Sequence, residues 1–139
     1  MTMSAIPSPT PTPSPLCGVI LLGHGSRDPL WRGPIEAVQA SIARAQPQTP
    51  CCCAYLELTE PDLAQAADQL IAQGVRELRI TPMFLGTGKH AREDIPRLVA
   101  ELQARHPGIG VEVQASVGED ERLTALLAQI ATESWPPGP

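Results

Sequence analysis

Aromatic residues are scarce in this chain, and no apolar run is long enough to cross a membrane. Only 3% of the 139 residues are aromatic while 42% are hydrophobic, so the core must be built mainly from aliphatic side chains. The apolar runs fall short of the ~18 residues that a transmembrane helix needs. The amino terminus also lacks the basic start and apolar centre of a signal peptide. We therefore expect no membrane association and a cytoplasmic location.

Basic residues and cysteines are also few. The chain has 10 Lys and Arg against 15 Asp and Glu, a formal net charge of −5. This balance argues against nucleic-acid binding, which usually needs a basic face. Three of the four cysteines are consecutive, at positions 51–53. Because successive side chains of a strand point to opposite faces, this run is a poor disulfide framework or zinc site, and we expect small buried residues with reduced thiols.

The chain divides into one domain between two polar ends. Residues 1–15 are Pro, Ser and Thr with little apolar content, which predicts a disordered extension. Residues 133–139 are rich in proline and predict a loose tail. The interval between them, residues 16–132, has the length of a single domain that can bury an adequate core.

Within this domain the hydrophobic pattern alternates between strand and helix four times. Such alternation favours right-handed crossovers and a parallel sheet covered by helices on both faces. We predict a flavodoxin-like or chelatase-like three-layer α/β domain with four parallel strands in the order 2-1-3-4. The predicted strands cover about residues 17–22, 51–58, 77–84 and 109–113.

The ends of three predicted helices carry recognisable signals. The second helix is predicted to start at Thr59, with Asp62 at the capping-box spacing and Glu60 as a first-turn acid, and to stop at Gly74. The third is predicted to end at His106, where an imidazolium would complement the helix dipole. The fourth is predicted to carry acids 119–121 in its first turn.

Three possible metal ligands follow the first three predicted strands at equal intervals. His24 lies between Gly23 and Gly25, Glu57 ends the second strand, and His90 follows the third. Each interval is 33 residues, from 24 to 57 and from 57 to 90, about one βαβ repeat. Ligands of open α/β sheets bind beyond the carboxyl ends of the strands. Two imidazoles and a carboxylate there suit divalent cobalt, iron or nickel.

Taken singly, each of these three residues is also explained as an ordinary loop side chain, and it is their equivalent placement that favours a site. Their neighbours can hold an anionic, flat ligand, because basic groups pair with carboxylates and glycines leave room. Solvated loop charge accounts for the basic residues equally well. These candidate binding residues are Gly25, Ser26, Arg27, Gly88, Lys89 and Arg92.

Three segments in this order resemble the signature of the small sirohydrochlorin chelatases, the CbiX-type cobaltochelatase family. They are Leu-Gly-His-Gly-Ser-Arg-Asp-Pro at 22–29, Leu-Glu-Leu-Thr-Glu-Pro at 56–61 and Gly-Lys-His-Ala-Arg-Glu-Asp-Ile-Pro at 88–96. The resemblance spans about residues 17–131. Neither the proline-rich extension nor the cysteine triplet belongs to the family pattern.

The resemblance implies a class II chelatase that inserts a divalent metal into sirohydrochlorin without ATP, in cobalamin or sirohaem synthesis. It implies a metal as substrate and no organic cofactor, with His24, His90 and Glu57 in the metal-handling and catalytic roles. Short members of the family act as homodimers, so it also implies a homodimer. Two other functions stay open from the residues: a non-enzymatic metal carrier or sensor, and a flavodoxin-like module for a different small anion, which would leave the equal intervals unexplained.

Overall fold

A computed structural model describes residues 16–134; the predicted extension at 1–15 and residues 135–139 of the predicted tail lie outside them. Ten elements follow one another along the described chain. They are β1 (Cys17–Gly23), the 3-10 helix η1 (Pro29–Arg32), α1 (Gly33–Ala45), β2 (Cys51–Tyr55), α2 (Leu63–Ala72), β3 (Glu77–Pro82), α3 (Lys89–Arg105), β4 (Gly110–Val113), the 3-10 helix η2 (Val117–Glu119) and α4 (Glu121–Thr132).

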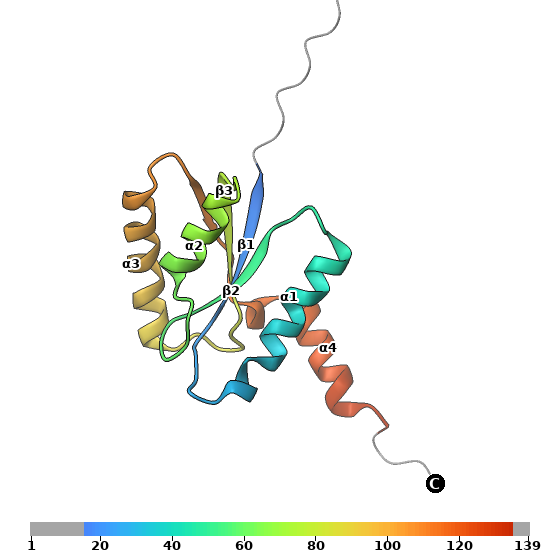
Figure 1. The fold of residues 1–139 in the computed structure, drawn as a ribbon. Coiled ribbons are helices and arrows are strands. Elements are labelled where there is room, and N and C mark those ends of the chain that lie inside the picture. The colour runs from blue at the N-terminus through green and yellow to red at the C-terminus, as the bar shows by residue number, and fades with distance from the viewer. Residues whose placement is uncertain (1–15, 135–139) are drawn as a thin grey trace, which may run out of the picture.

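The four strands form one parallel sheet in the order β2-β1-β3-β4, which confirms the predicted order. β1 is an inner strand, and its Ile20 pairs with Cys52 of β2 on one side and Ile80 of β3 on the other (Figure 1). The carboxyl ends of β1, β2 and β3 therefore meet at one edge of the sheet. Among the described residues, no helix has both the length and the apolar character to span a membrane.

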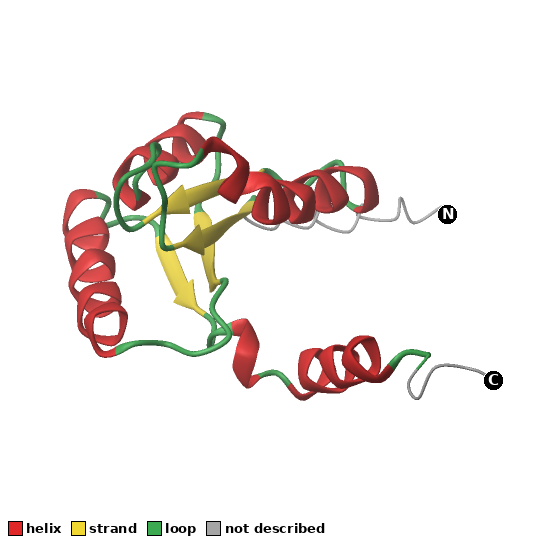
Figure 2. Ribbon diagram, turned by 90° about the horizontal axis from the view of Figure 1, so that it is seen from below, coloured by secondary structure: helices red, strands yellow, loops and turns green. Residues whose placement is uncertain are grey.

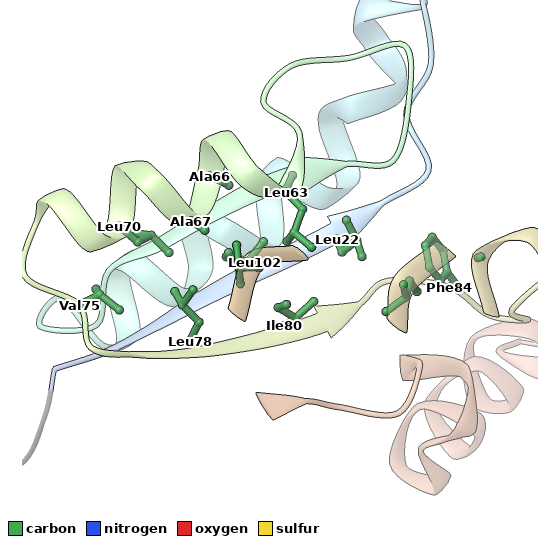
Figure 3. Packing of buried hydrophobic residues seen from close by; sticks show 14 residues of the cluster. Leu22, Leu63, Ala66, Ala67, Leu70, Val75, Leu78, Ile80, Phe84 and Leu102 are labelled. Atoms are coloured by element: carbon green, nitrogen blue, oxygen red, sulfur yellow. The ribbon is translucent and has the colours of Figure 1, made fainter. Parts of the chain in front are cut away.

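The larger core lies on the sheet face that α2 and α3 cover. Ile20, Leu22 and Ile80 are fully buried there, and Figure 3 shows Leu22 and Ile80 near Leu63 of α2, with Leu78 below Leu70 of the same helix. Burial of this aliphatic surface is the main source of stability, at about 25 cal/mol per Å² of apolar area.

The opposite face is only partly covered. α1 packs there over β1 and β2, around Ile35, Cys53 and Tyr55. Over β3 and β4 the same face is polar: Arg79 pairs with Glu112, and the Thr81 hydroxyl donates to a glutamine one strand away. Figure 2 shows α4 standing away from the sheet, and no residue of α4 is buried. Full cover of both faces, as predicted, is therefore wrong for the β3–β4 half.

Three predicted boundaries are corrected by the structure. The second strand stops at Tyr55 and not at residue 58, and Leu58 has a left-handed backbone conformation with φ of 65° that is incompatible with a strand. The third stops at Pro82 and not at residue 84. The fourth helix begins at Glu121 with Asp120 as its N-cap, so Glu119 falls in η2.

The start of α2 also differs from the prediction. Its capping box joins Asp62 and Gln65, each backbone N–H donating to the other's side chain at 2.8 Å. Glu60 precedes the helix and is not a first-turn acid. Thr59 lies three residues before the N-cap and so takes no part in the cap, and its hydroxyl bonds elsewhere. The predicted stop at Gly74 is confirmed by a φ of +103°, which glycine adopts freely.

His106 joins α3 to α2. Its Nε2 lies 2.9 Å from Oδ1 of Asp68, and Arg105 donates to Oδ2 of the same carboxylate at 2.8 Å. The hydrogen bond with His106, with Arg105 adding to it, lowers the pKa of Asp68 below its usual value of 3.8. The predicted end of the third helix at His106 is confirmed, since this residue is the C-cap of α3, and Asp68 is its side-chain partner.

We expect Ile80→Ala to lower the free energy of unfolding by about 2–5 kcal/mol, because it leaves a cavity in the larger core. Leu85→Ala is the matched control, since this side chain is 68% exposed and its loss should cost within about 0.5 kcal/mol. Urea denaturation measures both. Equal losses in the two variants would contradict the assignment of the core.

The Asp68 contacts should make stability depend on acid pH. A carboxyl whose pKa is lowered by folding contributes stability that is complete above its unfolded pKa and is lost as the pH falls through the folded one. Wild type should therefore lose stability more steeply than Asp68→Asn between about pH 5 and pH 2. Asp94→Asn, which removes a carboxylate paired only within α3, is the control and should follow wild type in thermal melts across this range.

Candidate functional site

His24 and Glu57 lie side by side at the carboxyl edge of the sheet. β1 ends at Gly23, and hydrogen bonding continues past it: the N–H of Leu56 donates to Gly23 O, and the N–H of Glu57 donates to His24 O, both at 3.0 Å. Both side chains are exposed. The structure thus brings together two of the three predicted ligands through their backbones, and leaves their side chains open to a ligand.

Gly25 makes this close approach possible. Its φ is +104°, and a Cβ at this position would lie 1.7 Å from the carbonyl oxygen of Glu57. The role seen here differs from the predicted one, since the glycine makes room for the protein's own backbone. Gly86 and Gly88 differ from it, because a Cβ at either would meet nothing within 4 Å, as expected for a place where a ligand has room.

Thr59 is a site residue that the sequence reasoning missed. Its hydroxyl accepts from the N–H of Ser26 at 3.0 Å and donates to Ser26 O at 2.7 Å, which ties the loop after β1 to the loop after β2. The Ser26 hydroxyl in turn accepts from the N–H of Asp28. Thr59 lies 33 residues after Ser26, the same interval as from His24 to Glu57, and that shared spacing is the signal that could have revealed the pair.

Phe84 supports His24 from the β3 side. The two ring centroids are 4.4 Å apart with the planes at 42°, and Phe84 is buried while His24 is exposed. The imidazole therefore rests on an apolar surface between two strand ends. Phe84 follows the same strand that leads to His90, so its position also bears on the second histidine.

His90 lies in the first turn of α3, after Lys89 and the N-cap Gly88, and both side chains are exposed. The preceding loop is held in place from two sides. Arg92 donates to Thr87 O at 2.7 Å, and the Thr87 hydroxyl contacts that of the buried Ser116. The Arg92 guanidinium thus already has a structural partner, whereas Arg27 is exposed at the other loop.

Within residues 16–134 no group of three His, Cys, Asp or Glu side chains is arranged to hold a metal ion. His24, Glu57 and His90 therefore do not form a ready-made three-ligand site in one copy of the chain. Hollows border the strand ends on two sides. One, of about 540 Å³, is lined partly by Gly86, Thr87 and Arg92, and the other, of about 470 Å³, is the apolar α1 groove, lined by Gly23, Leu30, Trp31, Pro34, Ile35, Val38 and Met83.

The cysteines of β2 are unsuited to catalysis or metal binding. Cys51, Cys52 and Cys53 are free thiols, as expected. Burial raises the pKa of Cys51 to about 11 and that of Cys52 to about 12. Because a thiol acts as nucleophile or ligand in its ionised form, these groups stay protonated and inert near neutral pH.

The family model named CbiX matches residues 18–134. The chain belongs to the CbiX family. A sirohydrochlorin cobaltochelatase of Methanothermobacter thermautotrophicus is 35% identical over 85 residues, 61% of this chain and 59% of that protein, so the match spans less than two thirds of it. A sirohydrochlorin cobaltochelatase of Saccharolobus solfataricus is 28% identical over 126 residues, 86% of this chain and 97% of that protein.

Solved structures share the CbiX fold. A putative cobalamin biosynthesis CbiX protein from Marinobacter aquaeolei has a TM-score of 0.76 at 29% identity, covering 88% of this chain and 99% of that one. The sirohydrochlorin chelatase SirB from Bacillus subtilis subspecies spizizenii, in complex with cobalt, has a TM-score of 0.71 at 24% identity. The match covers 85% of this chain and 51% of SirB, so the CbiX chain spans about half of that chelatase.

Gly25→Ala should disturb the site. The substitution places a methyl group on the Glu57 carbonyl at a φ that L residues rarely adopt, and should lower the free energy of unfolding by more than about 1 kcal/mol. Gly86→Ala, in open space, is the control and should cost less. Chemical denaturation of both, with the His24 imidazole followed by NMR, measures the effect. An unchanged His24 signal in Gly25→Ala would contradict the assigned packing.

Proposed function

We propose that this chain inserts divalent cobalt or iron into sirohydrochlorin without ATP, in cobalamin or sirohaem synthesis, with nickel as a further metal that the same ligands accept. The observation that best supports this function is the backbone hydrogen bond that places Glu57 beside His24 at the carboxyl end of an inner strand. The names of the relatives, sirohydrochlorin cobaltochelatases, supply the substrate. We expect this reaction to take place in the cytoplasm.

His24, Glu57 and His90 carry the chemistry in this proposal. Insertion exchanges the waters of the metal for pyrrole nitrogens and releases two pyrrole protons. The exposed imidazole of His24, resting on Phe84, accepts one of these protons as a general base. The Glu57 carboxylate attracts the cation and balances the charge that develops, and His90 offers a second imidazole from α3 that accepts the other pyrrole proton.

The metal in this reaction is a substrate that passes through the site. The three side chains do not converge in one copy, so we propose that the incoming ion and the macrocycle nitrogens complete the coordination. The carboxylates of sirohydrochlorin pair with the exposed Arg27 and Lys89 and with the outer face of Arg92. Gly25, Ser26 and Gly88 lie in the loops that border the flat ligand.

We further propose that the working form is a homodimer. SirB is a chain about twice as long as the part that this protein matches, and a second copy would supply the corresponding second half. A closed pair with twofold symmetry is the commonest assembly of such domains.

His24→Ala and His90→Ala should each reduce insertion by at least about 100-fold, because a positioned acid or base contributes 10²–10⁴ in rate. Glu57→Gln should also lose activity while keeping its backbone bonds. Absorbance change of sirohydrochlorin on addition of cobalt, iron or nickel measures insertion, and circular dichroism checks the fold. His106→Ala is the control, and it should retain insertion once corrected for stability.

Full insertion by both His24→Ala and His90→Ala would overturn the proposed mechanism. Titration with the tetrapyrrole in the absence of metal separates the enzyme from a metal carrier on the same scaffold. The enzyme should bind the ring and shift its absorbance, whereas a carrier would bind cobalt and leave the ring spectrum unchanged.

A further inference from the structure

Helix α4 presents an apolar stripe that the described chain leaves uncovered. Leu123, Leu126, Leu127 and Ile130 recur at helical spacing on one side of the helix. Leu126 is 50% exposed and Ile130 is 57% exposed. A helix of this kind is normally stabilised by packing its apolar face on a partner, so this stripe indicates a missing contact.

The chain's own sheet is a poor partner for this stripe. The uncovered half of the sheet carries the Arg79–Glu112 ion pair and the Thr81–Gln114 hydrogen bond, and burying such groups under leucine costs free energy. The start of α4 is also held in place, because η2 is bonded to the loop after β3 through Gly118 N–H to Phe84 O at 2.9 Å. Figure 2 shows the helix directed away from the sheet.

The α1 groove is a second uncovered apolar surface. All seven of its lining residues are apolar or glycine. Leu30 is 84% exposed, and Trp31 and Val38 are about two fifths exposed. Figure 2 shows α1 and α4 well apart from one another. One copy of the chain therefore exposes an apolar ridge and an apolar groove that do not meet.

We propose that two copies exchange these surfaces: the apolar stripe of α4 in one copy packs into the α1 groove of the other, and the reverse contact closes the pair. This proposal rests on the homodimer proposed above and assigns its contact. Reciprocal exchange covers both apolar surfaces of each copy in the same dimer. It leaves neither surface free to bind a third chain, so the assembly is closed, as for an isologous interface. The half-length match to SirB favours a second copy of this chain as the occupant.

Ile130→Glu and Val38→Glu test the two sides of this contact. Both residues are exposed in one copy, so the monomer should fold normally, but each charge would be buried in the dimer. Analytical ultracentrifugation over a range of concentrations should show a wild-type dimer, with the dissociation constant raised at least about tenfold in each variant. Ala125→Glu adds the same charge to the opposite side of α4 and should dimerise as wild type.

A charge-exchange mixture identifies which surfaces meet. Ile130→Lys and Val38→Glu should each be weakened alone and should form a heterodimer when mixed, because the introduced charges then face one another. A wild-type monomer at every concentration would overturn the proposal, as would a Val38→Glu variant that dimerises normally. Neither metal nor tetrapyrrole is present in these measurements, so their outcome is independent of the insertion assay. An active monomer would overturn the exchange and the homodimer but leave the proposed insertion standing. An inactive dimer would overturn the proposed insertion and leave the exchange standing.

Discussion

The pairing of β1 with strands on both sides is the constraint on which the rest of the structure depends. Ile20 and Leu22 of β1 are fully buried, and a shift of one residue would turn them to the opposite face of the sheet. The register is therefore fixed by burial. It extends one step past the strand, where the N–H of Glu57 reaches His24 O, so the same hydrophobic force that stabilises the core also aligns the two polar side chains.

The contacts that hold the loops in place do not involve the side chains that are proposed to react. The loops after β1 and β2 are tied by backbone bonds and by Thr59, and the imidazole of His24 rests on a buried ring. The carboxylate of Glu57 and the imidazoles need make no structural bond to stay in position. This suits the proposed metal-handling role, because a ligand side chain that already forms an ion pair would have to break it before binding a metal.

The repeat pattern of the sequence predicted the sheet and its order correctly, because regular burial at period 2 in strands and 3.6 in helices follows directly from packing. It predicted the neighbourhood of His24 and Glu57 for the same reason. The pattern did not predict local structure that depends on one backbone torsion or on a hydrogen-bond partner far away in the sequence. Leu58 continues the apolar pattern of the predicted strand, but its backbone has a left-handed conformation. Thr59 has the residue type of a helix cap, but its hydroxyl bonds to Ser26, 33 residues away in the sequence. The helical spacing of the α4 stripe shows which side of the helix is apolar, but periodicity cannot say whether the surface that covers it belongs to the same copy of the chain.

Under the proposed function, the donor groups at the sheet edge also bear on which metal the protein would insert. Burial keeps the thiols of Cys51 and Cys52 protonated, with pKa values of about 11 and 12. The exposed donors at the edge are thus imidazole nitrogen and carboxylate oxygen, whose affinity for divalent metals usually rises from iron through cobalt to nickel. Discrimination between these metals by the protein ligands alone would therefore be weak. If the proposed insertion takes place here, selection would depend on which ion the cell supplies and on the strength of its bonds to the four pyrrole nitrogens, and exposed side chains without ion-pair partners suit that dependence.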